Sequence, residues 1–387
     1  MKICILTPRF PLPERAGDVL RINNIARYLK AQGHELVLVS LYDEKPDVNS
    51  AQKLYDKVYK LKRNNKKSYL FSMLYVLSGR PMQCGYYHSS AFTNLLREVQ
   101  QKEKPDLYIS HLLRMTPYLL KLGVVKQSIV EMTDALSKNY SLSAGAKGKG
   151  FIKFVYSIEK YLIKRFELKV AKAFPKVVLV SQKDIDYLQG LTKTPLTSLA
   201  MHTNGVECVE TISSSYIPDK LCYIGNMRSL MNRDAALYFA NDIFPLILKK
   251  KPSAKFYIVG AEAPEKIQSL ACENIIVTGF IDDVQQFVSD ACLVVAPVRI
   301  ATGIQNKVLV AMGTGIPVVM NSLVATGIPE VVDGKNALVA DTPQEFADKC
   351  VKLMENDSLR QTLAVKGYET VRNCYSWKEK LQGYLDS

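Results

Sequence analysis

Short apolar runs alternate along the chain with amphipathic segments of roughly ten to twenty residues. The runs are rich in Val and Ile, which favour strands, and the segments between them have the wider apolar spacing typical of helices. In the first half we expect strands at Lys2–Thr7, Glu35–Ser40, Leu107–Ser110, Ser128–Met132 and Val177–Ser181. In the second half we expect them at Leu221–Ile224, Lys255–Val259, Ile275–Thr278, Leu293–Pro297 and Pro317–Met320. The pattern therefore predicts the same strand–helix order twice.

These runs are apolar at nearly every position rather than at alternate positions, which is typical of strands buried on both faces of a parallel sheet. Parallel strands joined by helical crossovers build a doubly wound sheet. We therefore expect an α/β fold with two Rossmann-like, doubly wound parallel-sheet domains. Ligands of such sheets bind at the carboxyl ends of the strands.

The length of 387 residues fits two domains. A turn followed by a Ser- and Pro-containing stretch predicts a hinge at 204–217, which separates a domain at 1–203 from a domain at 218–373. The last segment, about 374–387, holds Trp377, the one tryptophan of the sequence. We expect this segment to pack back onto the N-terminal domain.

The positive charge of the chain is confined to its first half. Residues 1–200 contain 33 Lys and Arg against 16 Asp and Glu, whereas residues 201–387 contain 18 against 21, so the net charge of +14 is a +17 half joined to a −3 half. Such an excess attracts nucleic acid, anionic membranes or phosphorylated substrates. Cations that merely solubilise a surface would be spread over both halves.

The eight cysteines are widely scattered and form no C-x-x-C pair, so neither a disulfide framework nor a zinc site is indicated. The apolar part of the N-terminal segment is too short for a secretory signal, and no stretch approaches about 18 uninterrupted apolar residues. These features favour a reducing cytoplasm.

The first predicted strand leads into a proline-rich turn at Pro8–Pro13 and then into a helix that begins near Gly17 and Asp18 and carries Arg21. Glycine at a helix start lets backbone N–H groups approach a ligand closely. The loop lacks the G-x-G-x-x-G pattern of dinucleotide-binding proteins, so NAD and FAD are not indicated.

The segment Pro297–Val319 carries the strongest chemical signal. A strand ends at Pro297, a loop with Gly303 follows, and a helix begins near Ile304. A helix N-terminus with cations beside it is suited to a diphosphate. We therefore expect Arg299 and Lys307 to bind phosphate oxygens, the alternative being two solvated surface charges.

Residues 311–319, with the sequence Ala-Met-Gly-Thr-Gly-Ile-Pro-Val-Val, resemble the signature of the retaining GT-B glycosyltransferases, in particular family 4 (glycosyl transferases group 1). The similarity also runs through Gly33–Glu35, Asn204–Val206, Ile258–Gly260, Thr278–Asp282 and Tyr375–Trp377. The resemblance implies two domains facing a central cleft, with a nucleotide-sugar donor on the C-terminal domain and the acceptor on the N-terminal one.

On this resemblance, donor binding falls to residues at the strand ends of the C-terminal domain. These are Gly225, Arg228, Phe280, Asp282, Arg299, Gly303, Ile304, Gln305, Asn306 and Lys307. The donor would be a UDP- or GDP-sugar. The family generally needs no metal, the sequence has no D-x-D triad, and we expect no other cofactor.

The chain departs from the family where many members carry two glutamates eight residues apart. Thr302 and Val310 occupy these positions, and a subgroup with a stretch like Gly303–Lys307 lacks the first glutamate but normally keeps the second. Val310 cannot accept a ribose hydrogen bond, a loss of about 1.5–3 kcal/mol. Either Asn306 or Gln305 holds the ribose instead, or donor binding is weak or absent.

Polar residues follow two predicted strands of the N-terminal domain. His111 and Arg114 follow one strand, and Asp134 follows the next, so all three should lie at the carboxyl edge of the sheet. We expect His111 to position a sugar hydroxyl and Asp134 to bind the acceptor or act as a base. The alternatives are a structural histidine and a helix N-cap. The expected acceptor-binding residues are Gly17, Asp18, Arg21 and Arg114.

Two segments concentrate the basic charge, Lys57–Lys67 and Lys147–Lys176, and both have aromatic and aliphatic residues within or beside them. This mixture is typical of a helix lying in an anionic membrane interface. The alternative is a core helix with a solvated basic face. No helix-turn-helix, zinc or RNP-type pattern supports nucleic acid as the partner.

The sequence thus predicts a retaining, metal-independent glycosyltransferase that moves a sugar from a nucleotide-sugar to a lipid-diphosphate-linked glycan or polysaccharide acceptor. We expect it to be cytoplasmic, peripheral on the inner face of the cell membrane through its basic N-terminal domain, and to act in cell-surface polysaccharide biosynthesis. The alternative is a catalytically degenerate GT-B protein that partners or activates another transferase.

Overall fold

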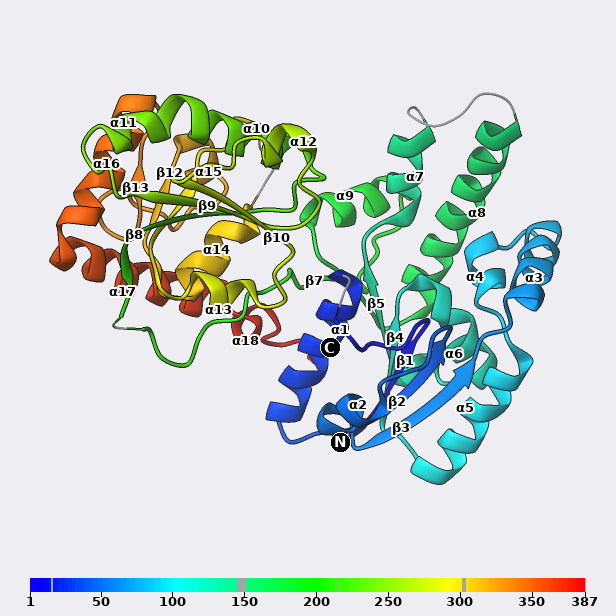
Figure 1. Cartoon of the computed structure of the whole chain (residues 1–387). Helices are drawn as coiled ribbons and strands as arrows, with labels where there is room; N and C mark the ends of the chain where they lie inside the picture. The colour runs from blue at the N-terminus through cyan, green and yellow to red at the C-terminus, as the bar shows by residue number, and fades with distance from the viewer. Residues whose placement is uncertain (15–16, 145–150, 214, 301–303, 387) are drawn as a thin grey trace. The chain divides into compact units, whose positions relative to one another are not determined.

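The computed structural model describes residues 1–14, 17–144, 151–213, 215–300 and 304–386. The chain forms two compact units, Met1–Asn204 with Leu381–Ser387, and Gly205–Lys380. Each unit contains one parallel sheet with helices around it (Figure 1). The end of the chain therefore belongs to the N-terminal unit, whereas the helices that precede it belong to the C-terminal unit.

The N-terminal unit has a seven-stranded sheet whose central strand is β1. In spatial order its strands are β3 (Lys57–Lys62), β2 (Glu35–Tyr42), β1 (Lys2–Thr7), β4 (Leu107–His111), β5 (Ser128–Thr133), β6 (Lys176–Leu179) and β7 (Leu199–Met201). All neighbouring pairs are parallel. The order reverses between β1 and β4, which makes the sheet doubly wound and places a topological switch point there.

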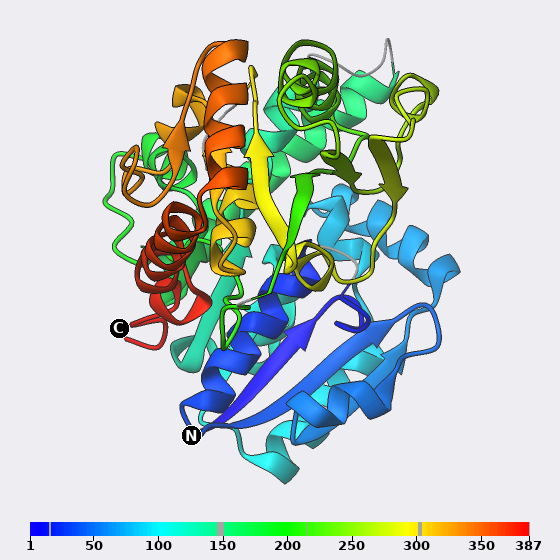
Figure 2. The same ribbon diagram turned by 60° about the vertical axis from the view of Figure 1, so that its left-hand side comes forward.

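Helices connect these strands on both faces of the sheet, and Figure 2 shows α1 and α5 on opposite faces. They are α1 (Gly17–Ala31), α2 (Val48–Leu54), α3 (Asn65–Leu77), α4 (Met82–Tyr86), α5 (Ser90–Glu103), α6 (Thr116–Leu122), α7 (Leu136–Ala144), α8 (Phe151–Ala173) and α9 (Gln182–Gly190), with 3₁₀ turns at Leu113–Met115 and Val125–Gln127.

The C-terminal unit has a six-stranded parallel sheet built in the same way around β8. Its strands in spatial order are β10 (Ile275–Gly279), β9 (Lys255–Val259), β8 (Ile217–Ile224), β11 (Ala291–Ala296), β12 (Val318–Met320) and β13 (Leu338–Val339). Its helices are α10 (Leu230–Tyr238), a π-helical turn (Phe239–Ile243), α11 (Phe244–Leu248), α12 (Glu265–Gln268), α13 (Val284–Val288), α14 (Asn306–Gly313), α15 (Ser322–Ala325), α16 (Pro343–Glu355), α17 (Asp357–Cys374) and α18 (Trp377–Lys380).

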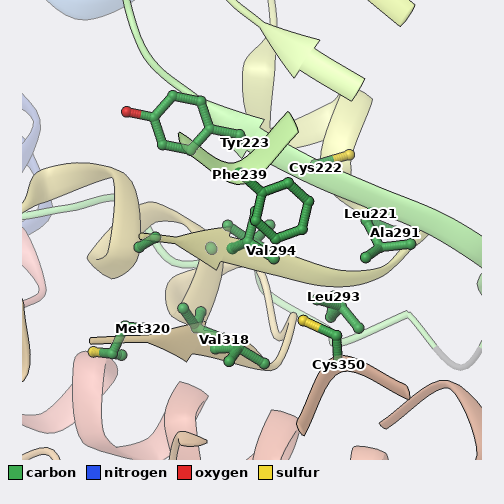
Figure 3. Packing of buried hydrophobic residues seen from close by; sticks show 14 of the residues in the cluster. Leu221, Cys222, Tyr223, Phe239, Ala291, Leu293, Val294, Val318, Met320 and Cys350 are labelled. Carbon is green, nitrogen blue, oxygen red and sulfur yellow. The ribbon is translucent and has the colours of Figure 1, made fainter. Parts of the chain in front are cut away.

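The core of the C-terminal unit explains why its strands are apolar throughout. Figure 3 shows side chains of the central strands packed together with Phe239 and Cys350, which come from helical segments. Leu293, Val294 and Val318 are completely buried. Because helices cover both faces of the strands, polar positions within them would lack solvent on either face.

The ten strands predicted from the sequence are all present; β1 and β9 have the predicted ends, and the others have ends shifted by a few residues. The prediction missed β3, β7 and β13. Strands β7 and β13 are only three and two residues long. Strand β3 lies at the sheet edge and has lysines at half of its six positions.

The position of β3 corrects the expectation for the basic segment Lys57–Lys67. Its first six residues form this edge strand rather than part of a helix, and charged side chains on an edge strand also discourage pairing with another chain. The helical part of the basic and apolar region is α3, which begins at Asn65.

Candidate functional site

Two loops of the C-terminal unit are fixed to each other at the carboxyl ends of β8 and β9. The Gly225 amide donates to the Val259 carbonyl at 2.9 Å, and the Met227 amide donates to Ala261 at the same distance. Gly260 has φ of +149°, and a Cβ there would lie 2.0 Å from the Gly225 carbonyl oxygen. Glycine is therefore required at Gly260, and the two loops form a rigid backbone platform.

Lys307 lies in the first turn of α14, and its ammonium group contacts neutral groups. Its Nζ donates to Tyr223 Oη at 2.8 Å and to Asn232 Oδ1 at 2.5 Å. The same nitrogen lies 4.6 Å from the centre of the Tyr223 ring. None of the ion pairs among the described residues includes Lys307. Burial lowers the pKa of Lys307 to about 8.

The position of Lys307 is chemically unusual, because burial without an acidic partner penalises its charged form. An anion placed beside the ammonium group would remove this penalty and raise the pKa. Tyr223 lies near the end of the strand β8, and Asn232 lies on α10. Both side chains therefore hold the lysine in place from well-packed elements. The arrangement is suited to binding a phosphate.

The other two predicted donor cations have different surroundings. Arg299 forms two hydrogen bonds with the Asp234 carboxylate, at 3.0 and 2.6 Å, and lies over the Tyr238 ring. Arg228 has 82% of its side chain exposed and lies 3.8 Å from Glu262. Arg299 is therefore already neutralised, and Arg228 is held in place by no strong contact.

The remaining predicted donor residues lie around the start of α14 and the end of β10. Gln305 is the N-cap residue of α14, Asn306 begins the helix, and Ile304 precedes them with 44% exposure. Phe280 is 71% exposed, and Asp282 is also exposed. Gly303 and Thr302 lie outside the described residues.

Val310 lies on α14, half-buried and packed against the hydrophobic core of the unit. Its side chain therefore contributes to packing. The family glutamate expected at this position has no counterpart here.

In the N-terminal unit, His111 ends β4 and is 1% exposed. Neither ring nitrogen has a hydrogen-bond partner among the described residues, and the closest carboxylate, that of Asp18, lies 3.9 Å from Nε2. Burial lowers the pKa of His111, so the ring is neutral at pH 7. A buried imidazole without a hydrogen-bond partner is uncommon and marks His111 as a candidate functional group.

Asp18 joins His111 to a second charged group. Burial works against its charged form, but the neighbouring His111 and the ion pair with Arg9 outweigh it and lower the pKa of this carboxyl. Gly17, next to Asp18, is the first residue of α1. The structure thus brings Asp18, a predicted acceptor residue, close to the predicted catalytic histidine.

The backbone is strained at the carboxyl ends of both strands that carry predicted catalytic residues. Leu112, directly after His111, has φ of +70°, and Thr133, directly before Asp134, has φ of +69°. Positive φ is costly for residues other than glycine and is concentrated at functional sites. Burial, together with Asp184, raises the pKa of Asp134. This shift is in the direction that favours a general base.

Arg21 has a structural role, which corrects its assignment to the acceptor. It is 1% exposed and forms two hydrogen bonds to the Glu131 carboxylate, at 2.8 and 3.1 Å. Its other donors reach Asn204 Oδ1 and the His202 carbonyl. Tyr384 also donates to Glu131, at 3.1 Å. With these bonds formed, Arg21 joins α1, β5 and the end of the chain.

Arg114 is half-buried and lies apart from this network. Its Nη1 is 3.4 Å from Tyr87 Oη, and its guanidinium lies 5.1 Å from the centre of that ring. Both of these contacts of Arg114 are therefore with one aromatic side chain, that of Tyr87.

Sequence reasoning missed Tyr223 and Asn232 as the partners of Lys307. Tyr223 reads as one more apolar residue of a buried strand, and Asn232 as a polar residue on a helix. The strained positions Leu112 and Thr133 were missed for the same reason, since both residue types are ordinary in sequence. These four residues become visible only through tertiary contacts and backbone geometry.

Within the described ranges, no group of three His, Cys, Asp or Glu residues is arranged to hold a metal ion. None of the described helices combines the length and apolar character needed to cross a membrane.

Two doubly wound parallel sheets, one with an anion-suited lysine at its carboxyl edge, agree with the GT-B fold class. Residues 218–356 match the family described as Glycosyl transferases group 1. The chain is therefore a glycosyltransferase of GT-B type whose C-terminal unit carries the group 1 domain.

Whole-chain similarity supports the same class. An uncharacterized 44.6 kDa protein in the cps region of Klebsiella pneumoniae is 22% identical, over 98% of this chain and 97% of its own. The crystal structure of Anabaena HepE in complex with UDP has a TM-score of 0.59 at 14% identity, covering 100% of this chain and 99% of that one. A TarM variant from S. aureus, in complex with UDP, has a TM-score of 0.62 at 13% identity, with 100% and 99% covered.

Proposed function

We propose that the protein is a retaining glycosyltransferase that takes its sugar from a nucleotide-sugar, a UDP- or GDP-sugar, bound at the carboxyl edge of the C-terminal sheet. The observation that carries the proposal is Lys307, a buried ammonium group held by Tyr223 and Asn232 without an acidic partner. The HepE and TarM structures contain UDP, which agrees with a uridine nucleotide as donor. Lys307 would neutralise the diphosphate as it leaves the sugar.

Backbone groups and side chains around Lys307 would complete the donor-binding site. Gly225 and the amides at the start of α14 would approach the diphosphate, as glycine and a helix N-terminus allow. Asn306 or Gln305 would bind the ribose in place of the glutamate that Val310 replaces. Phe280 and Asp282, both exposed at the end of β10, would contact the base.

The acceptor would bind the N-terminal unit near His111 and Asp134. The neutral, unpartnered imidazole of His111 can hydrogen-bond a sugar hydroxyl, and the raised pKa of Asp134 suits proton abstraction. We propose a lipid-diphosphate-linked glycan or a polysaccharide as acceptor, in cell-surface polysaccharide biosynthesis. The relative from the K. pneumoniae cps region supports this setting.

We propose further that catalysis needs no metal and that the enzyme works in the cytoplasm, on the inner face of the cell membrane. Lys307 and the helix N-terminus would neutralise the diphosphate in place of a metal ion. The basic N-terminal half supports attachment to an anionic surface.

The experiment is a turnover assay with a panel of UDP- and GDP-sugars and membrane lipid extract as acceptor, with and without EDTA. We expect one donor to be consumed at the same rate with and without EDTA. We also expect the product, examined by NMR, to keep the donor's anomeric configuration. Failure of every donor to bind or turn over would overturn the proposal, and loss of activity in EDTA would refute metal independence.

A second candidate function is that of a degenerate GT-B protein that partners another transferase, and Val310 is the observation that favours it. Val310→Glu distinguishes the two candidates. A large gain in nucleotide affinity would favour degeneration, whereas no gain or a loss would favour a site adapted to valine. Val308→Glu, at a fully buried position of the same helix, controls for the cost of placing a carboxylate there.

A further inference from the structure

A cavity of about 660 Å³ lies within the N-terminal unit, where α3, α4, α6 and α8 meet. Its wall contains four cations, Arg80, Lys121, Arg165 and Lys169, and no carboxylate. None of these four takes part in an ion pair with another described residue. Converging like charges repel one another, so the cavity is suited to an anion.

One side of this cavity is aromatic. The Tyr75 hydroxyl lies 2.9 Å from Nδ1 of His88, and the Arg80 guanidinium lies 5.6 Å from the centre of the Tyr75 ring. Burial, then the charges of Lys121 and Arg80, lower the pKa of His88. Lys121 and Arg80 therefore act on the same side chain of the cavity wall.

The helix beside the cavity, α3, buries small polar residues and exposes large apolar ones. It buries Ser68 and Ser72, and Ser72 satisfies its hydroxyl by donating to the Ser68 carbonyl at 2.9 Å. Gly85 of α4 explains the small inward residues, because a Cβ there would lie 2.5 Å from the Phe71 carbonyl oxygen. The two backbones are in close contact, so large side chains cannot fit between them.

The large apolar side chains of α3 point to solvent instead. Their exposed fractions are 66% for Tyr69, 56% for Leu70, 66% for Met73, 47% for Leu74 and 80% for Leu77. The spacing places them on one face of the helix. A helix of a soluble protein normally buries such a face, and an apolar patch of this kind marks an interaction site.

We propose that this cavity binds the phosphate headgroup of an anionic membrane lipid while the exposed apolar face of α3 enters the hydrocarbon of the same leaflet. The inference deepens the membrane part of the proposed function and rests on it. Leu77, the most exposed residue of this face, directly precedes Ser78, and Ser78 and Arg80 line the cavity, so the apolar face ends beside the cation-lined wall. Cations beside exposed apolar residues match a lipid, which has a charged head on an apolar tail.

The test is binding of the full chain to phosphatidylcholine vesicles with and without phosphatidylglycerol, measured by flotation in the absence of any sugar donor. We expect binding only to the anionic vesicles. The double variant Arg165→Ala, Lys169→Ala should lose about 30-fold in affinity, since each near-surface cation contributes about 1 kcal/mol. The control Lys126→Ala, Lys193→Ala removes two exposed lysines elsewhere in the unit and should lose less than twofold.

The apolar face is tested by Met73→Asp, Leu77→Asp, at two exposed positions where the fold should tolerate the change. This variant should also lose vesicle binding while its circular dichroism and Tm stay unchanged. Equal binding to neutral and anionic vesicles, or wild-type binding by either double variant, would overturn the inference.

Two further outcomes would assign the surface to another partner and overturn the inference. Binding of glycerol 3-phosphate at the cavity that is as tight as the binding of vesicles would indicate that the ligand is a soluble phosphate compound. Conversion of a dimer to a monomer by Met73→Asp, Leu77→Asp, with vesicle binding intact, would indicate an interface between copies. Vesicle binding without sugar transfer would contradict the transfer reaction alone, and transfer to a soluble acceptor without vesicle binding would contradict this inference alone.

Discussion

The two sheets share one topology but differ in how charge is arranged at their carboxyl ends. In the N-terminal unit, two of the cations there are matched by carboxylates, Arg21 by Glu131 and Arg9 by Asp18, whereas Arg114 contacts Tyr87. In the C-terminal unit, Lys307 is held by neutral groups. The half with the large positive charge therefore neutralises two of its buried or half-buried cations near the strand ends, whereas the nearly neutral half keeps the buried Lys307 available.

This difference teaches that net charge is a poor guide to a phosphate site. A diphosphate needs one or two fixed cations with no competing acid, which a unit of slightly negative charge can supply. The positive excess of the N-terminal unit lies elsewhere, on β3 and around the cavity beside α3. The two kinds of positive charge should respond differently to mutation, to pH and to ligand.

The largest effect is expected from breaking the matched pair. Arg21→Ala should lower the free energy of unfolding by about 3–5 kcal/mol, because it leaves the Glu131 charge buried without its partner. Urea unfolding measures this. Arg27→Ala, which removes a partly exposed partner of Glu14, should cost less than about 1 kcal/mol. Similar losses in both variants would mean that burial does not decide the strength of these pairs.

The next largest effect is expected at Lys307, the cation without an acidic partner. Lys307→Ala should reduce sugar transfer by about 10²–10³-fold with little loss of stability, because the diphosphate loses a fixed positive charge in the transition state. Steady-state kinetics and a thermal melt measure the two quantities. Lys255→Ala removes an exposed lysine at the amino end of β9 and should leave kcat unchanged. Full activity in Lys307→Ala would remove the donor site from this position.

A smaller effect is expected from pH. The pKa of Lys307 is lowered to about 8, so its charged form disappears as pH rises, and nucleotide affinity should fall about tenfold between pH 7 and 9. The free energy of unfolding should instead rise with pH over about pH 8 to 10, because Lys307 keeps its proton to higher pH in the unfolded chain than in the folded one. Calorimetric titration of UDP measures the affinity.

Lys307→Arg serves as the control for the pH effect, because a guanidinium stays charged over this range. Its nucleotide affinity should be independent of pH. A flat profile for the wild type, or an unchanged slope in the arginine variant, would show that another group titrates.

The smallest effect is expected from Arg299→Ala. Its guanidinium is half exposed and already paired with Asp234, so nucleotide affinity should change by less than about fivefold. The same titration of UDP measures it. A loss as large as that of Lys307→Ala would mean that Arg299 leaves Asp234 to bind the donor.

The fold could be predicted because parallel strands buried on both faces carry their signal in the sequence itself. All ten strands rich in Val and Ile were found, including β9 with its ends unchanged. The strand β3 was missed because an edge strand needs few apolar residues, and its lysines read instead as a basic surface segment. Strand β13, with two residues, is too short to leave a pattern.

The site was predicted less completely, because it depends on contacts between distant residues. Lys307 was identified from its position at a helix start, but its partners lie 84 and 75 residues away in the chain. Arg21 was assigned to the acceptor because a cation on the first helix looks available, yet its partner Glu131 is 110 residues away. The sequence left open whether the apolar residues of α3 face an interface or the core, and their exposure in the structure distinguishes the two.

The central claim is that Lys307, a single fixed cation in the C-terminal unit, binds the donor, whereas the cations around the cavity of the N-terminal unit bind a different ligand. Calorimetric titration of UDP into the wild type, Lys307→Ala, and Arg165→Ala, Lys169→Ala tests it most directly. We predict that Lys307→Ala loses at least tenfold in UDP affinity and that the double variant, with the greater loss of charge, binds as the wild type does. Equal losses in both variants, or a loss confined to the double variant, would contradict the claim.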